Sequence, residues 1–367
     1  MIKKIQLSII GCGDISGAYL TASKIFSNIE IVACADIKME TAKLKATEYN
    51  LKAMTVDELL ADEQIQIVLN LTTPQAHSKI NVKALNAGKH VYCEKPLAVE
   101  KNDGKKVVAL AKEKGLLVGC APDTFLGGGH QTCRKLIDDG VIGKPIAGTA
   151  FMMLHGHESW HPNPGFYYLK GGGPMLDMGP YYLTALINML GPVRRVSAST
   201  SITFKERIAT SEKRSGERLP VETPTHIAGT MDFHCGAVIT IVTSFDVWYH
   251  SNHFIEIHGT DGSIQVPDPN YFGGPVKICR AGNELWEEVP LSHGYTDNMR
   301  SIGVADMALA IQQKSINRCN GYMAYHVLEV MHAFLESSES GKHILIESTC
   351  ERPDMLPLNL ARGQLIV

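Results

Sequence analysis

A lysine beside a carboxylate ends one short apolar segment of this sequence, in the order Glu94-Lys95-Pro96. The three residues before it, Val91-Tyr92-Cys93, favour a β-strand. Parallel α/β sheets bind ligands at the carboxyl ends of their strands, where a lysine can handle a proton or stabilise negative charge. Pro96 disfavours a helical conformation for Lys95. The alternative is a surface ion pair at a strand-to-helix turn, and the surrounding sequence has to decide between the two.

A glycine turn lies near the start of the chain, with the sequence Gly11-Cys12-Gly13-Asp14-Ile15. A strand over residues 4–10 precedes it, and a helix, a second strand over residues 30–35 and Asp36 follow. Strand, glycine turn, helix, strand and acid is the order of a dinucleotide-binding unit. The glycines allow a tight turn and a close approach of a pyrophosphate to the helix N-terminus. Asp36 is predicted to accept hydrogen bonds from a ribose, the alternative being a solvated turn residue.

The alternation of strands and helices continues to about residue 121. Helices are predicted over residues 39–49, 56–61 and 104–114, and another after Thr72-Thr73-Pro74-Gln75-Ala76-His77. Strands are predicted over residues 65–71, around Val91 and over 116–120. This pattern indicates a doubly wound parallel sheet of Rossmann type with right-handed crossovers. We therefore expect residues 1–121 to form a dinucleotide-binding domain.

Residues 122–367 are predicted to form an α+β domain with a large, mainly antiparallel sheet, which binds substrate and forms oligomers. Strands are expected over residues 146–154, 195–205, 226–233, 237–247, 254–258 and 263–266, and helices over 130–139, 299–313 and 322–337. The charged segment 207–219 is predicted to be an exposed loop. A helix is expected to end at Gly191, with Pro180 either in its first turn, in which case Asp177 precedes the helix, or at a kink within it.

Three histidines and a glutamate occupy one short stretch, His155-Gly156-His157-Glu158-Ser159-Trp160-His161. A metal site is one interpretation, but the spacing differs from a zinc-binding HExxH helix, and Gly156 favours a loop. We favour a loop that contacts a sugar, with no metal.

The composition is that of an ordinary globular protein, with 44% hydrophobic and 20% charged residues and a formal net charge of -3. The sequence contains no basic, aromatic-rich run, so nucleic acid is not an expected partner. It contains no apolar run long enough for a membrane span. The nine cysteines are scattered without a CxxC pair, which favours a reduced, cytoplasmic setting.

Taken together, four motifs resemble the glucose-fructose oxidoreductase / inositol dehydrogenase / rhizopine-catabolism (Gfo/Idh/MocA) family. They are the glycine turn, Thr73-Pro74-Gln75-Ala76-His77, Ala87-Gly88-Lys89-His90-Val91 and Glu94-Lys95-Pro96. The resemblance extends into the second domain through Gly171-Gly172-Gly173-Pro174-Met175-Leu176-Asp177-Met178-Gly179-Pro180-Tyr181. It implies that Lys95, Asp177 and Tyr181 form the catalytic group. The family commonly has histidine at the position of Tyr181; its sugar-oxidoreductase branches have tyrosine there.

The resemblance also implies the binding residues. The cofactor contacts would be Gly11, Cys12, Gly13, Asp14, Ile15, Asp36, Thr72, Thr73, Pro74, His77, Glu94, Lys95 and Trp160, and the substrate contacts would be Lys95, His157, Asp177 and Tyr181. An ordinary buried aromatic is the alternative for Trp160.

We therefore expect a homo-oligomeric oxidoreductase that uses NAD rather than NADP and acts on a secondary alcohol or ketone of a sugar or polyol. An NAD-dependent glycoside hydrolase that works by transient oxidation is the main alternative. A non-catalytic cofactor-binding regulator ranks last, because such a protein should lack Lys95.

Overall fold

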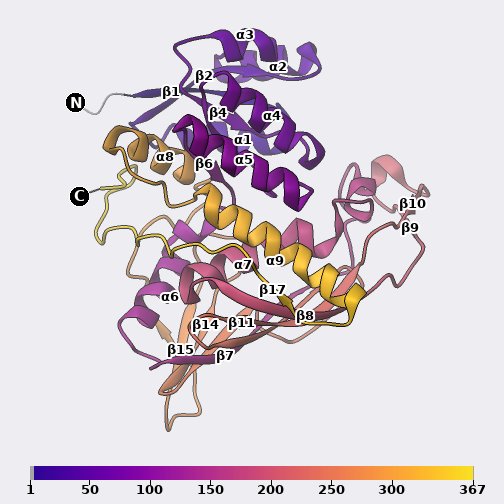
Figure 1. The fold of residues 1–367 in the computed structure, drawn as a ribbon, viewed down its shortest axis with the longest axis vertical. Helices are drawn as coiled ribbons and strands as arrows, with labels where there is room; N and C mark the ends of the chain where they lie inside the picture. The colour runs from indigo at the N-terminus through magenta and orange to yellow at the C-terminus, as the bar shows by residue number, and fades with distance from the viewer. Residues whose placement is uncertain (1–3, 367) are drawn as a thin grey trace.

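The computed structural model describes residues 4–366, in which helices connect two large β-sheets (Figure 1). The first sheet is parallel, in the order β3-β2-β1-β4-β5-β6. Its strands are β1 Ile5–Ile10, β2 Ile29–Ala35, β3 Lys52–Ala53, β4 Ile67–Asn70, β5 His90–Cys93 and β6 Val118–Cys120. The order reverses between β1 and β4, which creates the ligand crevice of a doubly wound fold. The predicted Rossmann-type sheet is confirmed.

Five helices connect these strands: α1 Asp14–Ser23, α2 Met39–Tyr49, α3 Val56–Ala61, α4 Pro74–Asn86 and α5 Lys101–Lys114. Local sequence sets several of their ends. Thr55 and Glu58 form a capping box at the start of α3, and Gly115 ends α5 in a left-handed conformation. The predicted bounds of α2 and α3 are confirmed, whereas α5 begins earlier than expected.

The second sheet has nine strands in the order β16-β15-β14-β13-β7-β12-β11-β8-β17. Their bounds are β7 Pro145–Met153, β8 Val193–Ser201, β11 His226–Phe233, β12 Val238–Ser244, β13 Ile255–Gly259, β14 Gly262–Val266, β15 Val276–Arg280, β16 Glu287–Val289 and β17 Ile344–Leu345. All neighbouring pairs are antiparallel except β7 and β12. The predicted α+β region with a mainly antiparallel sheet is confirmed.

Helices α6 Gly128–Asp138, α7 Gly173–Leu190 and α9 Gly321–Ser340 lie on one face of this sheet (Figure 1). Of the two positions considered for Pro180, the first turn is excluded, because α7 begins at Gly173 and runs through Pro180, so Asp177 lies within the helix. Pro174 takes the first-turn position that proline favours, while Pro180 removes one hydrogen bond from the helix interior. The segment from Gly179 to Leu190 is buried throughout, so packing offsets that loss.

The expectation of an exposed loop over residues 207–219 is confirmed only in part. A hairpin of β9 Glu206–Ile208 and β10 Arg218–Pro220 frames this segment, with a short 3-10 turn over Glu212–Arg214. Arg207 is buried, and its guanidinium pairs with Glu158 and Asp246. Both partners are distant in sequence, so the local run of charges gave no sign of this burial.

Two helices from the end of the chain pack against the first sheet, and one of them, α9, also contacts the second. Helix α8 Ile302–Gln313 packs near β2 and β6, and α9 contacts α5, α7 and β8. The Asn28 side chain donates to the carbonyl of Ala305 at 2.8 Å, and the Ser301 hydroxyl donates to the carbonyl of Tyr19 at 2.9 Å. Among residues 4–366, no helix is both long enough and apolar enough to span a membrane.

Candidate active site

The glycine turn between β1 and α1 has the shape that a bound dinucleotide needs. Gly11 has φ +102°, and a Cβ there would lie 2.6 Å from the backbone of Leu71. A Cβ at Gly13 would meet nothing within 4 Å, so the turn leaves space directly before the N-terminus of α1. Asp36, at the end of β2, accepts from the backbone amide of Cys12 at 2.9 Å. These residues fit a pyrophosphate on the helix N-terminus and a ribose beside Asp36.

The segment after β4 lies on the other side of the crevice. Thr72 donates its hydroxyl to the side chain of Asn70 at 2.7 Å, and Thr73 precedes Pro74 at the start of α4. His77 is buried: its Nδ1 lies 2.6 Å from the carbonyl of Pro96 and its Nε2 lies 2.9 Å from the carbonyl of Thr72. The structure therefore places His77 behind the crevice, where it ties together the segments after β4 and β5.

The surroundings of His77 favour its charged form. Burial by itself lowers the pKa of the imidazole, but Cys93 and the two carbonyl acceptors outweigh burial and raise the pKa to about 9. Only an imidazolium can donate from both ring nitrogens at once. The same backbone carbonyls that fix the ring therefore also hold its second proton.

Glu94 anchors the end of β5 to the helix of the glycine turn. One carboxylate oxygen accepts from the hydroxyl of Tyr19, in α1, at 2.7 Å, and the other accepts from the amide of Lys95 at 2.9 Å. This pairing replaces the surface ion pair considered from the sequence. It fixes the backbone from which the Lys95 side chain extends.

Lys95, Asp177 and His157 form one hydrogen-bonded chain across the two halves of the molecule. The Lys95 ammonium donates to Asp177 Oδ1 at 2.8 Å and to the Asp177 carbonyl at 2.7 Å. His157 Nε2 lies 3.1 Å from Asp177 Oδ2. A carboxylate can only accept, so this ring nitrogen carries the proton. Both oxygens of Asp177 are thus occupied by donors.

The charges of Lys95 and Asp177 stabilise each other. Burial opposes the ammonium form of Lys95, but the neighbouring Asp177 raises the pKa of Lys95 above its ordinary value. Burial likewise opposes the ionised form of Asp177, yet Lys95 and His157 lower the pKa of the Asp177 carboxyl to about 2. At neutral pH the site therefore holds an ammonium and a carboxylate, and one N–H of Lys95 remains for a ligand.

Tyr181 lies one helical turn beyond Asp177, so α7 presents both side chains to Lys95. The Lys95 nitrogen lies 5.2 Å from the centre of the Tyr181 ring. Burial raises the pKa of the Tyr181 phenol, while the charge of Lys95 acts in the opposite direction without cancelling this effect. Tyr181 therefore carries its proton at neutral pH.

Arg300 is a neighbour of Tyr181 that the sequence gave no reason to single out. Its positive charge acts to lower the pKa of the Tyr181 phenol, and its side chain donates to Asn270 at 3.1 Å. The buried carboxylate of Asp123 accepts from the amides of Ser301 at 3.2 Å and Gly303 at 3.1 Å. Asp123 thus fixes the segment that carries Arg300.

A cavity of about 280 Å³ opens between these groups. Its wall includes residues of the helices and loops that follow the strands of the first sheet, namely Ile15, Thr72, Pro74, Glu94 and Lys95. It also includes Phe166, Tyr167, Asp177 and Tyr181 from the second region. Phe166 and Tyr167 belong to a 3-10 turn, Pro164–Tyr168, that the sequence analysis did not assign to the site. The run of aromatics Phe166-Tyr167-Tyr168 was the available signal.

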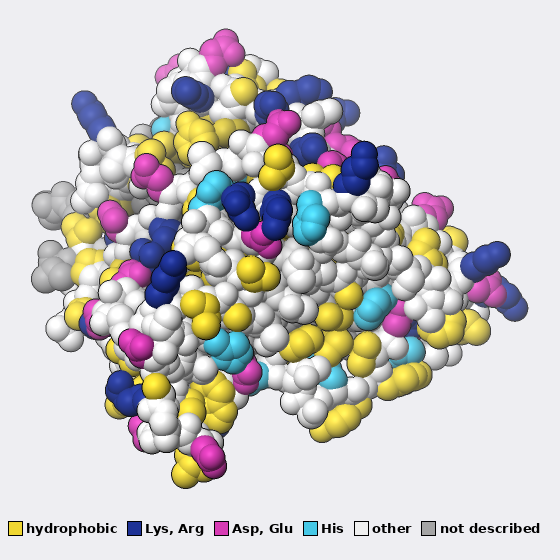
Figure 2. All heavy atoms as spheres, turned by 60° about the horizontal axis from the view of Figure 1, so that its bottom comes forward, with side chains coloured by type: hydrophobic (Ala, Val, Ile, Leu, Met, Phe, Trp, Pro, Cys, Tyr) yellow, Lys and Arg dark blue, Asp and Glu magenta, His cyan; other side chains and the backbone are white. Residues whose placement is uncertain are grey.

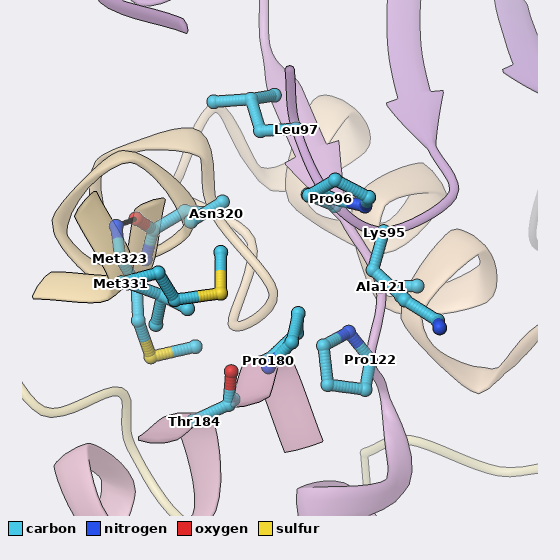
Figure 3. A pocket seen from close by; sticks show the side chains of 13 residues that line it. Lys95, Pro96, Leu97, Ala121, Pro122, Pro180, Thr184, Asn320, Met323 and Met331 are labelled. Carbon is cyan, nitrogen blue, oxygen red and sulfur yellow. Dashed lines mark hydrogen bonds between the residues drawn. The ribbon is translucent and has the colours of Figure 1, made fainter. Parts of the chain in front are cut away.

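Behind Lys95 the site is closely packed. Figure 3 shows Pro96, Pro122 and Pro180 converging there, with Met323 and Met331 on the far side. The space between them is only about 10 Å³, near the minimum for one water molecule. This close packing restrains Lys95 on the side away from the larger cavity.

The histidine-rich loop points its side chains in different directions. His155 stacks on Trp248, His157 contacts Asp177, and the ring of His161 packs against Tyr167. Among residues 4–366, no group of three or more potential metal ligands is arranged to hold an ion. Trp160 is 62% exposed and packs its ring edge-on to His157, so it is not an ordinary buried aromatic. It does not line the cavity beside Lys95.

Comparison with known proteins identifies the two halves of the chain. Residues 5–121 match an oxidoreductase family model with an NAD-binding Rossmann fold, and residues 130–265 match the GFO/IDH/MocA C-terminal domain. The chain is 28% identical to 1,5-anhydro-D-fructose reductase of Ensifer adhaerens, over 70% of this chain and 74% of the relative. It is 26% identical to D-glucoside 3-dehydrogenase of Escherichia coli, over 93% of this chain and 97% of the relative.

The fold is similar to that of levoglucosan dehydrogenase solved with NADH and levoglucosan. The TM-score is 0.79 at 20% identity, and the match covers 94% of this chain and 100% of the other. Both family models and the relatives agree with the resemblance drawn from the motifs, and the chain belongs to the GFO/IDH/MocA family of NAD-binding oxidoreductases.

Proposed function

We propose that the protein moves hydride between NAD(H) and a secondary alcohol or ketone of a sugar or polyol, with Lys95, Tyr181 and Asp177 as the groups that act on the substrate. The observation that carries this proposal is the Lys95–Asp177 pair, held beside Tyr181 at the carboxyl end of β5. When bound, NAD supplies the hydride acceptor, or the donor in its reduced form. The glycine turn and Asp36 fit that cofactor, and residues 1–121 are the proposed domain for it.

Lys95 is proposed to bind and polarise the substrate oxygen. Two of its N–H groups donate to Asp177, which fixes the orientation of the ammonium. The third N–H therefore has a fixed direction and is available for the ligand. A positive charge at this point stabilises negative charge that develops on the oxygen during the reaction. Asp177 keeps the ammonium ionised, and His157 keeps the Asp177 carboxylate in place.

Tyr181 is proposed to transfer the proton. For reduction of a ketone, the protonated phenol donates to the oxygen as the alcohol forms. For oxidation of an alcohol, Tyr181 first has to lose its proton, which burial disfavours and Lys95 favours. Arg300 supports the same ionised form, because its nearby positive charge acts to lower the pKa of the phenol.

The chemistry of the relatives supports a carbohydrate substrate. One relative is named 1,5-anhydro-D-fructose reductase and another D-glucoside 3-dehydrogenase, so both names describe the reduction or oxidation of a carbohydrate. The proposal is tested by incubating the enzyme with NAD and a panel of sugars and polyols while following NADH absorbance. The reverse assay uses NADH and the matching keto sugars. Stoichiometric NADH formation from at least one sugar is the expected result.

The hydrolase alternative receives no support from the relatives named above. It would be favoured by glycoside cleavage without net NADH formation. Measuring released aglycone and NADH in the same reaction separates the two activities.

We also propose that residues 122–367 form the substrate domain and that the helix-free face of its sheet joins copies of the chain. Figure 2 shows a broad part of this face where uncharged side chains and histidines predominate over charged ones. Val238 and Thr240 of β12 are exposed there. Light scattering should give an oligomer, and Thr240→Arg should reduce its mass.

The free cysteines support a cytoplasmic location.

A further inference from the structure

A second cavity, of about 580 Å³, lies against the loop that carries His157. His155 and Glu158 of this loop line one side of it, Phe204 and Arg207 line another, and Trp248 covers part of it. None of the residues that line it also lines the cavity between Lys95 and Tyr181. It lies near the β9–β10 hairpin, on the side of the molecule where hydrophobic and histidine side chains gather at the right of Figure 2.

Arg207 provides a fixed hydrogen-bond donor at this cavity. It is only 5% exposed, and its terminal nitrogens donate to Glu158 at 2.8 Å, to the carbonyl of Phe245 at 2.7 Å and to Asp246. Its Nε has no hydrogen-bond partner among the described residues. A buried donor without an acceptor is unfavourable, and a ligand oxygen that reached it after a neighbouring side chain moved aside would remove that cost.

His155 provides a second donor. Its Nε2 lies 3.3 Å from a terminal nitrogen of Arg207, and a guanidinium can only donate. Nε2 therefore accepts, and the neutral ring carries its proton on Nδ1. Within residues 4–366 this Nδ1 is also buried without a partner.

Two aromatic rings complete the cavity. Trp248 is 82% exposed, yet its ring stacks on His155 with 3.4 Å between centroids and 12° between planes. The Phe204 ring lies under the Arg207 guanidinium at 4.9 Å. Exposed aromatic surface beside convergent polar groups is typical of a ligand pocket. It suits the C–H face of a pyranose or cyclitol ring, whose hydroxyls point outward.

The charges favour a neutral ligand. Glu158 and Asp246 together oppose the single positive charge of Arg207, and the carboxylate of Glu206 also lines the cavity, where it pairs with Arg218. An anionic ligand would meet more negative than positive charge. A neutral polyhydroxyl ring offers acceptor oxygens to both free donors without that repulsion.

We propose that this cavity is a second binding site for a neutral sugar or polyol ring, which packs on Trp248 and accepts hydrogen bonds from Arg207 and His155. This goes beyond the proposed function, because the ligand here is bound and not oxidised. Its contact with Glu158 would also steady the loop that presents His157 to Asp177.

The test uses the full chain carrying Lys95→Met and Tyr181→Phe, which removes the group proposed to polarise the substrate oxygen and the group proposed to transfer its proton. D-glucose, myo-inositol and D-gluconate are titrated by ligand-observed NMR. We expect D-glucose or myo-inositol to bind more tightly than D-gluconate. Adding Trp248→Ala should weaken this binding at least about tenfold, the effect of losing a central aromatic contact. Tyr249→Ala is the matched control, because Tyr249 is 88% exposed and does not line the cavity.

A third variant, His155→Phe, keeps a ring under Trp248 and removes the N–H, so it should weaken binding. It also removes an acceptor for Arg207, but the same Arg207 nitrogen keeps its bond to Glu158, so the melting temperature should change little. The proposal is overturned if Trp248→Ala leaves sugar binding unchanged, if D-gluconate binds best, or if no neutral probe binds. It is also overturned if Trp248→Ala only lowers the oligomer mass, which would make the cavity a contact between copies. Turnover of the same sugars by the unmodified chain is measured separately, so a failure of the proposed oxidoreductase activity would not be confused with a failure of this site.

Discussion

Replacing Lys95 with methionine tests the centre of the proposed mechanism. Methionine has a similar length but supplies no charge and no N–H group. The variant therefore loses both hydrogen bonds to Asp177 and the remaining N–H proposed for the substrate oxygen. It leaves the Asp177 carboxylate largely buried, with His157 as its remaining side-chain partner.

Two magnitudes follow from this geometry. Breaking a buried ion pair by removing one partner destabilises a protein by about 3–5 kcal/mol, and we expect the lower end because His157 remains. Loss of a positioned proton-handling group lowers kcat by about 10²–10⁴-fold.

The pKa of Asp177 is about 2 in the intact protein, below its ordinary value of 3.8. Its contribution to stability is present above pH 3.8 and is lost as the pH falls through 2, so the two proteins should differ most at neutral pH.

The assay compares melting temperature, NADH binding by fluorescence and turnover of the best sugar from the panel. Lys101→Met is the control, because Lys101 forms a similar ion pair with Glu336 at 2.9 Å but at a more exposed site. That variant should lose about 0–1 kcal/mol of stability and keep its turnover. Lys95→Met should keep NADH binding within a few fold and lose turnover.

A double variant separates stability from catalysis. In Lys95→Met with Asp177→Asn, the buried charge is gone, so stability should largely recover while turnover stays low. The reasoning is refuted if Lys95→Met retains turnover within about tenfold of the intact enzyme, below the range for a proton-transfer group. It is equally refuted if the double variant is no more stable than the single one.

Three further predictions follow from neighbouring residues. Because burial keeps Tyr181 protonated, the rate of sugar oxidation should rise as the pH increases above neutral. Tyr181→Phe should lower kcat and flatten the dependence of kcat on pH. An unchanged pH dependence in this variant would contradict the proposed proton transfer by Tyr181. Asp36→Ala should reduce the ratio of kcat/KM with NAD to kcat/KM with NADP. Equal kcat/KM values for NAD and NADP in the intact enzyme would contradict the prediction that Asp36 binds the ribose and favours NAD. The pKa of His77 is raised from 6.5 to about 9, so its stabilising contribution should be complete below pH 6.5 and lost as the pH rises through 9. Chemical denaturation of His77→Gln should show a loss of about 1–3 kcal/mol at pH 6 that shrinks by pH 10.

Much of the first domain could be predicted because its signals are local. Gly11 and Gly13 mark the turn, the apolar runs mark buried strands, and each acid or base after a strand lies at the same edge of a parallel sheet. Two helices were predicted with the observed bounds for the same reason. Propensity and capping act within a few residues, so a short window of sequence contains them.

The errors arose where distant contacts outweighed local preference. Pro180 indicated a helix start or a kink, and burial of α7 against the sheet and α9 keeps the helix continuous through it. Arg207 lies in a charged segment that indicated solvent, yet its partner Glu158 is 49 residues away and was not visible to a local pattern. Arg300 reaches Tyr181 only through the packing of a segment held by Asp123.

The sequence by itself determined the dinucleotide turn, the parallel sheet, the mainly antiparallel second sheet and the residue types available for proton transfer. Tertiary structure decided which of those residues meet. Lys95 and Asp177 are 82 residues apart, and they form a pair only because β5 ends where α7 begins its second turn. Burial of that pair sets its charges, because desolvation and the opposite charge act together only in the folded protein.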